Sequence, residues 1–230
     1  MKLRAPMKLS DNTLKILKNF SGINQSILIK KGSNLRTINV MKNVYAEASI
    51  EEEFPRDVAI YDLFEFLNGL GLYSHPELDF SQDSYLIIKE GNRMVKYFYA
   101  DPAVIVTPPE KEIKLPSEDI HFQIDKDQLD ALLKASSVYK LTDFSVIGEA
   151  GVIKMVVRQK KNSTSNEFSV TVGTTNENFI GNFKVENIKI IPGKYDVYIT
   201  KAANNPCAKF VNTNYSTTYF IAMEPDSTFN

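Results

Sequence analysis

Two short sequences of one kind open the two halves of this chain: Ser10-Asp-Asn-Thr-Leu-Lys-Ile-Leu-Lys-Asn-Phe20 and Asp125-Lys-Asp-Gln-Leu-Asp-Ala-Leu-Leu-Lys-Ala135. Each starts on a side chain that caps helix N-termini well. Each then spaces its apolar residues at helical intervals and places lysines on another side, as amphipathic helices do. Because strand-like segments follow both, the sequence predicts a duplicated unit with one basic helical stripe per copy, a surface suited to an anionic partner.

The first half is expected to hold two helices. The first runs from Ser10 to Gly22, and the second covers residues 62–69, from a capping aspartate to a glycine. The expected apolar side of the first helix consists of Leu14, Ile16, Leu17 and Phe20. The expected strands cover residues 26–30, 35–40, 44–50, 56–61, 77–80, 85–89 and 94–100. A turn at residues 31–34 is expected to join the first two strands into a hairpin.

The second half is expected to repeat this order. Its first helix, over residues 126–139, buries Leu129, Leu132 and Leu133 and exposes a row of charged residues at intervals of four. A short helix over residues 185–190 is expected to stop before Pro192-Gly193. The expected strands cover residues 144–147, 152–158, 167–172, 178–183, 195–200, 208–212 and 217–223, and His121 begins a further strand-like segment.

This order of elements predicts an α+β fold in which the helices of each half pack on one face of antiparallel sheets. The expected parts are an N-terminal domain over residues 1–100, a connecting strap over 101–120 and a C-terminal domain over 121–230. Prolines in the strap favour extended backbone. Its apolar residues indicate that it lies on the protein surface and does not behave as a free linker.

The composition is that of a folded globular chain, with 43% hydrophobic and 24% charged residues. No apolar run approaches the roughly 18 residues of a membrane span, and the first residues lack the apolar core of a signal peptide, so no membrane partner is expected. The net charge of −1 argues against a protein that coats nucleic acid indiscriminately. A DNA-binding surface would therefore require charges that are segregated within each half.

Catalysis is not expected. The two histidines, His75 and His121, are not at a metal-ligand spacing, and the single cysteine, Cys207, has no obvious histidine partner. The chain has no phosphate loop and no complete dinucleotide fingerprint. Asp79 and Asp83 lack a third ligand, so no metal and no cofactor are expected.

Seven short motifs occur here in the order in which one protein family carries them. They are Leu17-Lys-Asn-Phe20, Tyr45-Ala-Glu-Ala48, Asp57-Val-Ala-Ile-Tyr-Asp-Leu63, Ala100-Asp-Pro102, Pro192-Gly193 with Tyr195, Ala208-Lys-Phe210 and Asp226-Ser-Thr228. On these motifs the chain resembles the sliding clamps, the DNA polymerase processivity factors of T4-like bacteriophages. The resemblance runs from Met7 to the end of the sequence.

The resemblance implies a closed homotrimeric ring around duplex DNA, which it holds without regard to base sequence. Each subunit would supply two similar domains of the sliding-clamp fold, with sheets outside and helices lining the hole. The implied partners are the replicative DNA polymerase that the ring tethers, an ATPase clamp loader that opens the ring, and the late-transcription machinery that the ring activates. The implied location is the cytoplasm of an infected bacterial host.

Lysines on helices that line such a ring would neutralise phosphates without reading bases, so the ring would hold DNA and still slide. The residues expected to face DNA are Lys15, Lys18, Lys126, Lys134, Lys140, Lys184 and Lys189. Ordinary solvated helix lysines give the same pattern. Two features interrupt the basic stripe: Ser137 stands where the relatives carry a second basic residue, and the 62–69 helix carries Asp62 and Glu65 but no lysine.

In sliding clamps generally, the tail of a partner protein inserts into an apolar pocket beside the strap and near the C-terminus. Here the resemblance points to Val104, Val106, Pro109, Leu115, Met223 and Pro225. The same side chains would also serve to fasten the strap to its own sheets. The main rival function is that of a phage virion structural protein, which the β content and the symmetry also fit. The lysines in both halves and the series of motifs favour the clamp.

Overall fold

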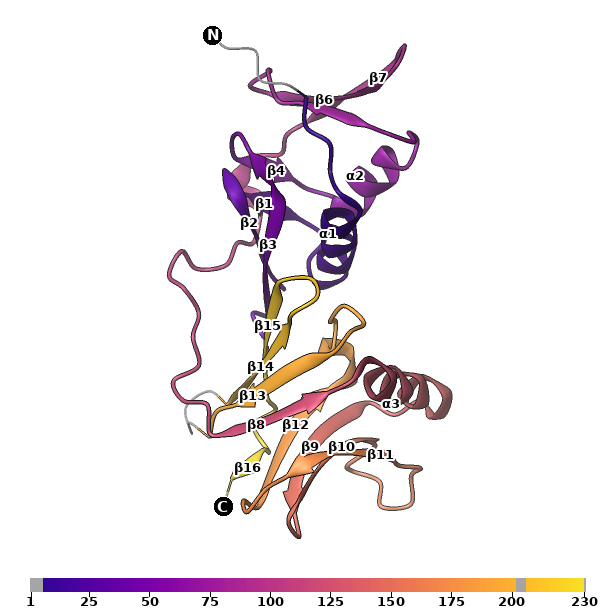
Figure 1. The fold of residues 1–230 in the computed structure, drawn as a ribbon, viewed down its shortest axis with the longest axis vertical. Helices are drawn as coiled ribbons and strands as arrows, with labels where there is room; N and C mark the ends of the chain where they lie inside the picture. The colour runs from indigo at the N-terminus through magenta and orange to yellow at the C-terminus, as the bar shows by residue number, and fades with distance from the viewer. Residues whose placement is uncertain (1–5, 202–205, 230) are drawn as a thin grey trace. The chain divides into compact units, whose positions relative to one another are not determined.

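The computed structural model describes residues 6–201 and 206–229 of the chain. The chain divides into two compact units, one up to Glu110 and one from Lys111 on, so the division lies inside the segment 101–120 expected to be a strap. Figure 1 shows the elements of each unit, with the helices of the first unit on one side of its strands.

The first unit contains two α-helices, a 3-10 turn and short strands. The helices are α1 (Asp11–Ile23) and α2 (Leu63–Leu70), and the 3-10 turn is η1 (Pro102–Val104). The strands are β1 (Ile27–Ile29), β2 (Gly32–Ile38), β3 (Val44–Phe54), β4 (Val58–Ile60), β5 (Glu77–Asp79), β6 (Tyr85–Glu90) and β7 (Arg93–Phe98). All pairings are antiparallel: β1 with β4, β2 with β3, and β5, β6 and β7 in a three-stranded sheet.

The start of α1 is fixed by side chains. The Ser10 Oγ accepts a hydrogen bond from the Thr13 backbone N–H at 3.3 Å. The carboxylate of Glu52, on β3, accepts from the Ser10 N–H and from the Thr13 hydroxyl, so it satisfies donors that the first turn of a helix leaves unpaired. The cap predicted at Ser10 is therefore confirmed, and Glu52 is a second contributor.

The buried side of α1 faces β2 and β3. Ile16, Leu17 and Phe20 are buried as predicted, whereas Leu14 is only half-buried. Thr13 is 1% exposed and takes the place expected for Leu14. The apolar side of α1 is thus rotated slightly from the predicted one, toward the residue that bonds to Glu52.

The hairpin expected across residues 31–34 is wrong. β1 pairs with β4, in the register Ile27↔Ile60, and β2 pairs with β3. Asp57 accounts for this arrangement, because its carboxylate accepts hydrogen bonds from the Lys31 N–H and the Lys30 Nζ, both at 2.9 Å. These bonds join the end of β1 to the residues just before β4, a long-range contact that a local turn signal does not reveal.

Among its described residues, the second unit contains one α-helix, α3 (Lys126–Tyr139), and one 3-10 turn, η2 (Val185–Asn187). The strands are β8 (Ile120–Ile124), β9 (Asp143–Glu149), β10 (Val152–Arg158), β11 (Phe168–Thr174), β12 (Phe179–Lys184), β13 (Tyr195–Ile199), β14 (Cys207–Asn212), β15 (Thr217–Ala222) and β16 (Thr228–Phe229). One sheet has the order β11-β10-β9-β12-β16, and β15, β14, β13 and β8 pair in that order. α3 packs on β10 and β11.

The bounds of α3 agree with the predicted helix. The Asp125 N–H donates to the Gln128 Oε1 at 3.1 Å, which pairs a backbone group at the start of the helix. Leu129 and Leu132 are fully buried, and Leu133 is half-buried. The helix ends at Lys140, whose φ of 54° is in the left-handed region typical of helix C-termini.

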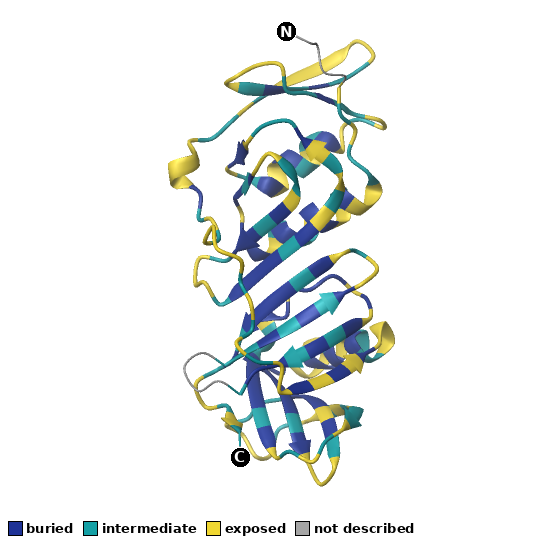
Figure 2. Ribbon diagram, turned by 60° about the vertical axis from the view of Figure 1, so that its left-hand side comes forward, coloured by how far each residue is buried: buried dark blue, intermediate teal, exposed yellow. Residues whose placement is uncertain are grey.

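An aromatic cluster forms the centre of the second unit. Tyr195 packs edge-on against Phe210 and Tyr219, and Phe183 packs edge-on against Phe144 and Phe210. All five rings are 0% exposed. Figure 2 shows where buried residues lie along the strands of each unit and where the exposed residues of the loops lie.

The short helix expected over residues 185–190 is wrong. η2 makes one 3-10 turn, and beyond it Ile188, Ile190 and Ile191 are all buried. A helix would have turned one of these side chains away from the core, whereas the irregular segment buries all three. The predicted repeat is therefore incomplete, because within the described residues the second unit has one α-helix where the first has two.

Candidate DNA-facing helices and partner-binding residues

α1 presents both of the lysines expected on its outer side. Lys15 and Lys18 are exposed and lie opposite the side that packs on β2 and β3. The helix has a single carboxylate, Asp11, in its first turn, where the helix dipole favours a negative charge. The rest of the outer face of α1 is therefore positively charged.

α3 has two lysines and two aspartates, and both aspartates lie in its first half, so its C-terminal half carries only positive charge. Lys126, in the first turn, forms an ion pair with Asp130, and this bond raises the pKa of Lys126. Lys134 and Lys140 are exposed, as is Ser137 between them. Because the carbonyl end of a helix favours cations, Lys140, at the C-terminal cap, is compatible with the local field of α3.

Lys184 and Lys189 lie on different elements from those predicted. Lys184 is the last residue of β12, and its Nζ lies 2.8 Å from the Asp143 Oδ1, a hydrogen bond that raises the pKa of Lys184. Lys189 follows η2 in irregular backbone. The helix that would have placed both side chains in a basic stripe is absent, so the structural basis for assigning them to DNA is lost.

α2 adds no positive charge to the helical surfaces. Its N-terminal cap, Asp62, accepts hydrogen bonds from the Glu65 N–H at 2.8 Å and from the Gln25 Nε2 at 2.9 Å. These bonds, first that from Glu65, lower the pKa of Asp62. The exposed residues of the helix are Phe64, Glu65 and Asn68, so of the two α-helices of the first unit only α1 presents lysines.

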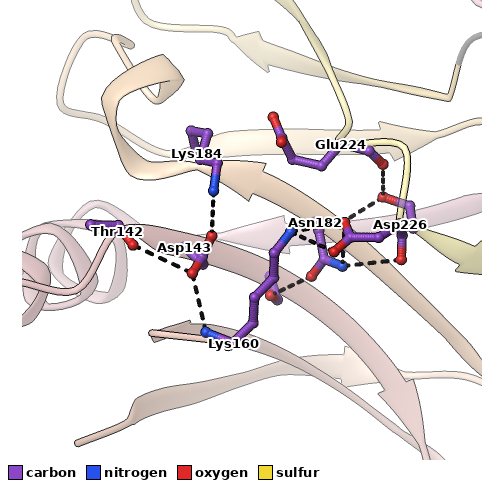
Figure 3. A network of polar contacts seen from close by, with 9 residues as sticks. Thr142, Asp143, Lys160, Asn182, Lys184, Glu224 and Asp226 are labelled. Carbon is purple, nitrogen blue, oxygen red and sulfur yellow. Dashed lines mark hydrogen bonds and ion pairs between the residues drawn. The ribbon is translucent and has the colours of Figure 1, made fainter. Parts of the chain in front are cut away.

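A polar network that the sequence did not predict holds the second unit together beside its C-terminal segment (Figure 3). The Asp143 carboxylate, whose side chain is 6% exposed, accepts hydrogen bonds from the Lys184 Nζ at 2.8 Å and the Lys160 N–H at 3.1 Å. Burial acts to raise the pKa of Asp143, but the bonds from Lys184 and Lys160 outweigh it, and the pKa is lowered. Asp143 is therefore a negatively charged link between β9, β12 and the loop after β10.

The same network fixes the C-terminal segment. The Asn182 N–H donates to the Ser227 Oγ at 2.9 Å, and the Asn182 Nδ2 donates to the Asp226 carbonyl oxygen at 3.3 Å. The Lys160 Nζ lies 2.7 Å from the Asp226 Oδ2. Together these bonds hold β16 along the outer edge of β12.

The candidate pocket residues of the first unit lie on a segment that is hydrogen-bonded to Asn24, just after α1, and to Arg36 of β2. The Asn24 Nδ2 donates to the Val106 carbonyl at 3.2 Å, and the Arg36 guanidinium donates to the Pro109 carbonyl at 2.9 Å. Val106 is half-buried and Pro109 is exposed. Val104 is 57% exposed.

The candidate pocket residues of the second unit differ in exposure. Met223 is 7% exposed, and its Sδ lies beside Gly181 of β12, where a Cβ would approach it to 3.2 Å. Leu115 is half-buried and Pro225 is exposed. Met223 therefore serves the core of this unit, and the accessible apolar residues are Leu115 and Pro225.

Two exposed apolar residues that the sequence did not point to lie at the tip of the β2–β3 hairpin. Val40 is 70% exposed and Met41 is 78% exposed. Asn39 makes the tip rigid, because its Oδ1 accepts from the N–H groups of Asn43 and Val44, both at 3.0 Å. A signal was available in the sequence, since an apolar pair inside an Asn-bounded turn departs from the usual turn composition.

Within the part of the chain that the structure describes, no group of three or more His, Cys, Asp or Glu side chains is placed to hold a metal ion. None of the helices described there has the length and apolar content needed to cross a membrane. Burial raises the pKa of the Cys207 thiol to about 12, so this group is not an activated nucleophile.

Two family profiles match this chain and together account for most of it. The profile described as DNA polymerase processivity factor matches residues 8–107, and the one described as gp45 sliding clamp, C terminal, matches residues 121–225. The sliding clamp of Escherichia phage RB69 is 35% identical over 96% of this chain and 99% of its own length. The sliding clamps of Vibrio phage KVP40 and Enterobacteria phage T4 are 33% and 32% identical over 95% and 96% of this chain, and each is covered over 99% of its length.

Solved structures of distant proteins have the same fold. PCNA of A. fulgidus, in a structure titled as bound to the C-terminal region of FEN-1, superposes with a TM-score of 0.70 at 13% identity, covering 98% of this chain and 100% of that one. The DNA polymerase III subunit beta DnaN sliding clamp of Bartonella birtlesii superposes with a TM-score of 0.70 at 15% identity, covering 97% of this chain and 66% of that one. The predicted α+β sliding-clamp fold is thus confirmed, and the chain belongs to the sliding clamps of T4-like phages, the processivity factors of their DNA polymerases.

Proposed function

We propose that this protein acts as a closed ring that encircles duplex DNA and slides on it without reading its sequence. The observation that carries the proposal is the placement of exposed lysines on one helix of each unit, Lys15 and Lys18 on α1 and Lys134 on α3. Lysines on these helices would neutralise DNA phosphates, and this attraction retains DNA. Because phosphate contacts do not depend on base sequence, the ring would still be able to slide. Family membership supports the same function.

The test is topological. The purified protein is loaded onto nicked circular DNA with its clamp loader and ATP, and the circle is then linearised with a restriction enzyme. A ring that encircles DNA is retained on the circle and runs off the linear product. Retention on the linear DNA with open ends, or failure to load at all, would contradict the proposal.

Two strands support the assembly of three copies into this ring. Among the described strands of six or more residues, β7 and β11 are the two that contain no buried residue. Each forms the edge of its sheet, β7 in the first unit and β11 in the second. The exposed apolar residues of β7 are Met94, Val95 and Phe98.

An open strand edge with exposed apolar side chains is a site for pairing with another chain. Because the two edges belong to different units, pairing of β7 in one copy with β11 in the next is a head-to-tail contact, and head-to-tail contacts form a ring when the rotation from copy to copy closes. Light scattering on the free protein should give the mass of three chains. A monomer at all accessible concentrations would overturn the proposed ring.

We further propose that the exposed apolar residues beside the strap of the first unit bind the tails of partner proteins, the DNA polymerase among them. Val40, Met41 and Val104 are exposed on rigid or hydrogen-bonded backbone, which is the character of a preformed docking surface. The distant PCNA structure with a bound C-terminal region supports capture of a tail by this fold. Substitution of Met41 by Asp should weaken binding of a polymerase tail peptide, measured by calorimetry, and leave the trimer intact.

Family membership also supports three finer assignments. The ring would be opened by an ATPase clamp loader, would activate late transcription once it is on DNA, and would act in the cytoplasm of the infected bacterium. The transcription assignment is tested by adding the protein to late-promoter templates with and without the loader. Transcript levels should rise only when the ring is loaded, and an equal rise without loading would contradict the assignment.

A further inference from the structure

We propose that Lys161, in the loop that follows β10, forms with Lys140 a second phosphate-binding site just beyond the C-terminal end of α3. This inference rests on the proposed encirclement of DNA and deepens it, because it adds a DNA-binding loop to a surface otherwise made of helices.

The loop is bonded directly to the end of α3. Residues 159–162 form a turn that is closed by a hydrogen bond from the Asn162 N–H to the Gln159 carbonyl at 2.9 Å. The Gln159 side chain donates from its Nε2 to the carbonyl of Lys140 at 3.1 Å. Lys161 therefore belongs to a tight turn that is anchored to the residue at which α3 ends.

The two consecutive lysines of this turn have different surroundings. The Lys160 side chain is 12% exposed and is bonded to Asp226 in the network of Figure 3. Lys161 is exposed, and within the described residues no ion pair involves its side chain. Because Lys160 is directed to the C-terminal segment, the turn presents Lys161 to solvent.

The local charge balance leaves this end of the unit positive. Two carboxylates of the network, Asp143 and Asp226, are each bonded to a lysine, and Glu224 enters the network through its backbone carbonyl, with its own charge acting on Lys184. Lys134, Lys140 and Lys161 have no such partner in the described part of the chain, and the carboxylate of the loop, Glu167, lies at its other end. Lysines without carboxylate partners on one helix end and its adjoining turn form a surface for phosphates, with no group aimed at a base.

Lysine footprinting tests this inference. Rings loaded onto nicked circular DNA, and free rings, are acetylated briefly with an N-hydroxysuccinimide ester and compared by mass spectrometry. Lys161 and Lys140 should be protected on DNA together with Lys15 and Lys134, whereas Lys114, whose side chain is 72% exposed on the segment before β8, should react equally in both states. Equal reactivity of Lys161 with protection of Lys15 and Lys134 overturns the inference and leaves the proposed function standing. Equal reactivity of all of these lysines overturns both.

Matched variants give an independent measurement. Binding of the trimer to a short duplex is followed by anisotropy at several salt concentrations. Affinity falls as salt rises, and Lys161→Gln should make this fall less steep, by about 0.9 in the slope of log affinity against log salt for each phosphate that the lysine neutralises. Lys161→Arg should restore the wild-type slope. Lys114→Gln should leave the slope unchanged. An unchanged slope in Lys161→Gln contradicts the inference, and light scattering on each variant verifies that the trimer is intact.

Discussion

The carboxylate of Asp143 illustrates what one side chain does in the second unit, because it joins β9 to Lys184 of β12 and to the Lys160 N–H. Asp143→Asn removes the charge and leaves the half-buried Lys184 ammonium without its partner. We expect the free energy of unfolding to fall by about 2–3 kcal/mol at pH 7, as measured in urea. Glu112→Gln, which breaks the ion pair between Glu112 and Lys114 at side chains that are 67% and 72% exposed, is the control and should cost less than about 1 kcal/mol.

The same residue gives a prediction for pH. The folded pKa of Asp143 is lowered, so its stabilisation is fully present above the pKa of the unfolded carboxyl, about 3.9, and is lost as the pH falls through the folded pKa. The difference in stability between the wild type and Asp143→Asn should therefore be constant from pH 7 to about 5 and shrink below about 4. A difference that persists unchanged at low pH would show that packing, and not charge, is responsible.

Charge reversal tests the helix lysines one by one. Lys15→Glu and Lys134→Glu each place a carboxylate on an exposed helical position, so we expect weaker retention on circular DNA and an unchanged trimer mass. Lys114→Glu, which makes the same change at an exposed residue outside the helices, is the control. Wild-type retention by both helix variants would refute the assignment of α1 and α3 to the DNA surface.

The sequence predicted the exposure of individual side chains only where that exposure depends on neighbouring residues in the chain. Lys15, Lys18 and Lys134 lie on predicted helices, and their exposure followed from helical periodicity. Lys184 was misplaced because its partner, Asp143, is 41 positions away and is brought close by the pairing of β9 with β12. A contact of that kind leaves no trace in the spacing of neighbouring residues.

At the scale of elements, prediction succeeded where a signal was continuous and capped. The bounds of α3 were obtained from its apolar spacing, and those of β10 from its apolar run between turn residues. Prediction failed at residues 185–190 because a short segment that mixes apolar and polar residues next to Pro192 is as compatible with irregular backbone as with a helix. It also missed β16, whose two residues owe their pairing to the Asn182 and Asp226 bonds.

β9 provides a test at this scale. Gly148 is opposite Phe179 of β12, and a Cβ at Gly148 would lie 2.2 Å from that ring and 2.8 Å from the Glu177 carbonyl oxygen. Gly148→Ala should lower the free energy of unfolding by about 1–3 kcal/mol, because the ring has to move. Gly22→Ala in α1, where a Cβ meets nothing within 4 Å, should be neutral or stabilising by up to about 1 kcal/mol. Thermal denaturation of both proteins checks the pair, and equal effects would refute the steric account.

At the scale of the whole molecule, the exposure of β7 makes a prediction about assembly. Met94 is 56% and Phe98 is 66% exposed, so replacing both by Glu should cost a single chain little stability. If β7 pairs with another copy, the double variant should be monomeric by light scattering and should fail to stay on circular DNA. Val104→Glu, at a valine that is 57% exposed outside β7, should remain trimeric. A trimeric double variant would place the subunit contact elsewhere.

The raised pKa of Cys207 has a practical consequence for observing the ring in motion. A thiol with a pKa of about 12 is almost entirely protonated at neutral pH, and it is the thiolate that reacts with maleimides. The native protein should therefore take up little maleimide dye at pH 7, as measured by absorbance, and should take up about one dye per chain when urea unfolds it at the same pH and exposes the thiol. The native wild-type chain would therefore give almost no labelling at pH 7. A cysteine introduced at exposed Ser137 would then carry a fluorophore at a single known position per subunit.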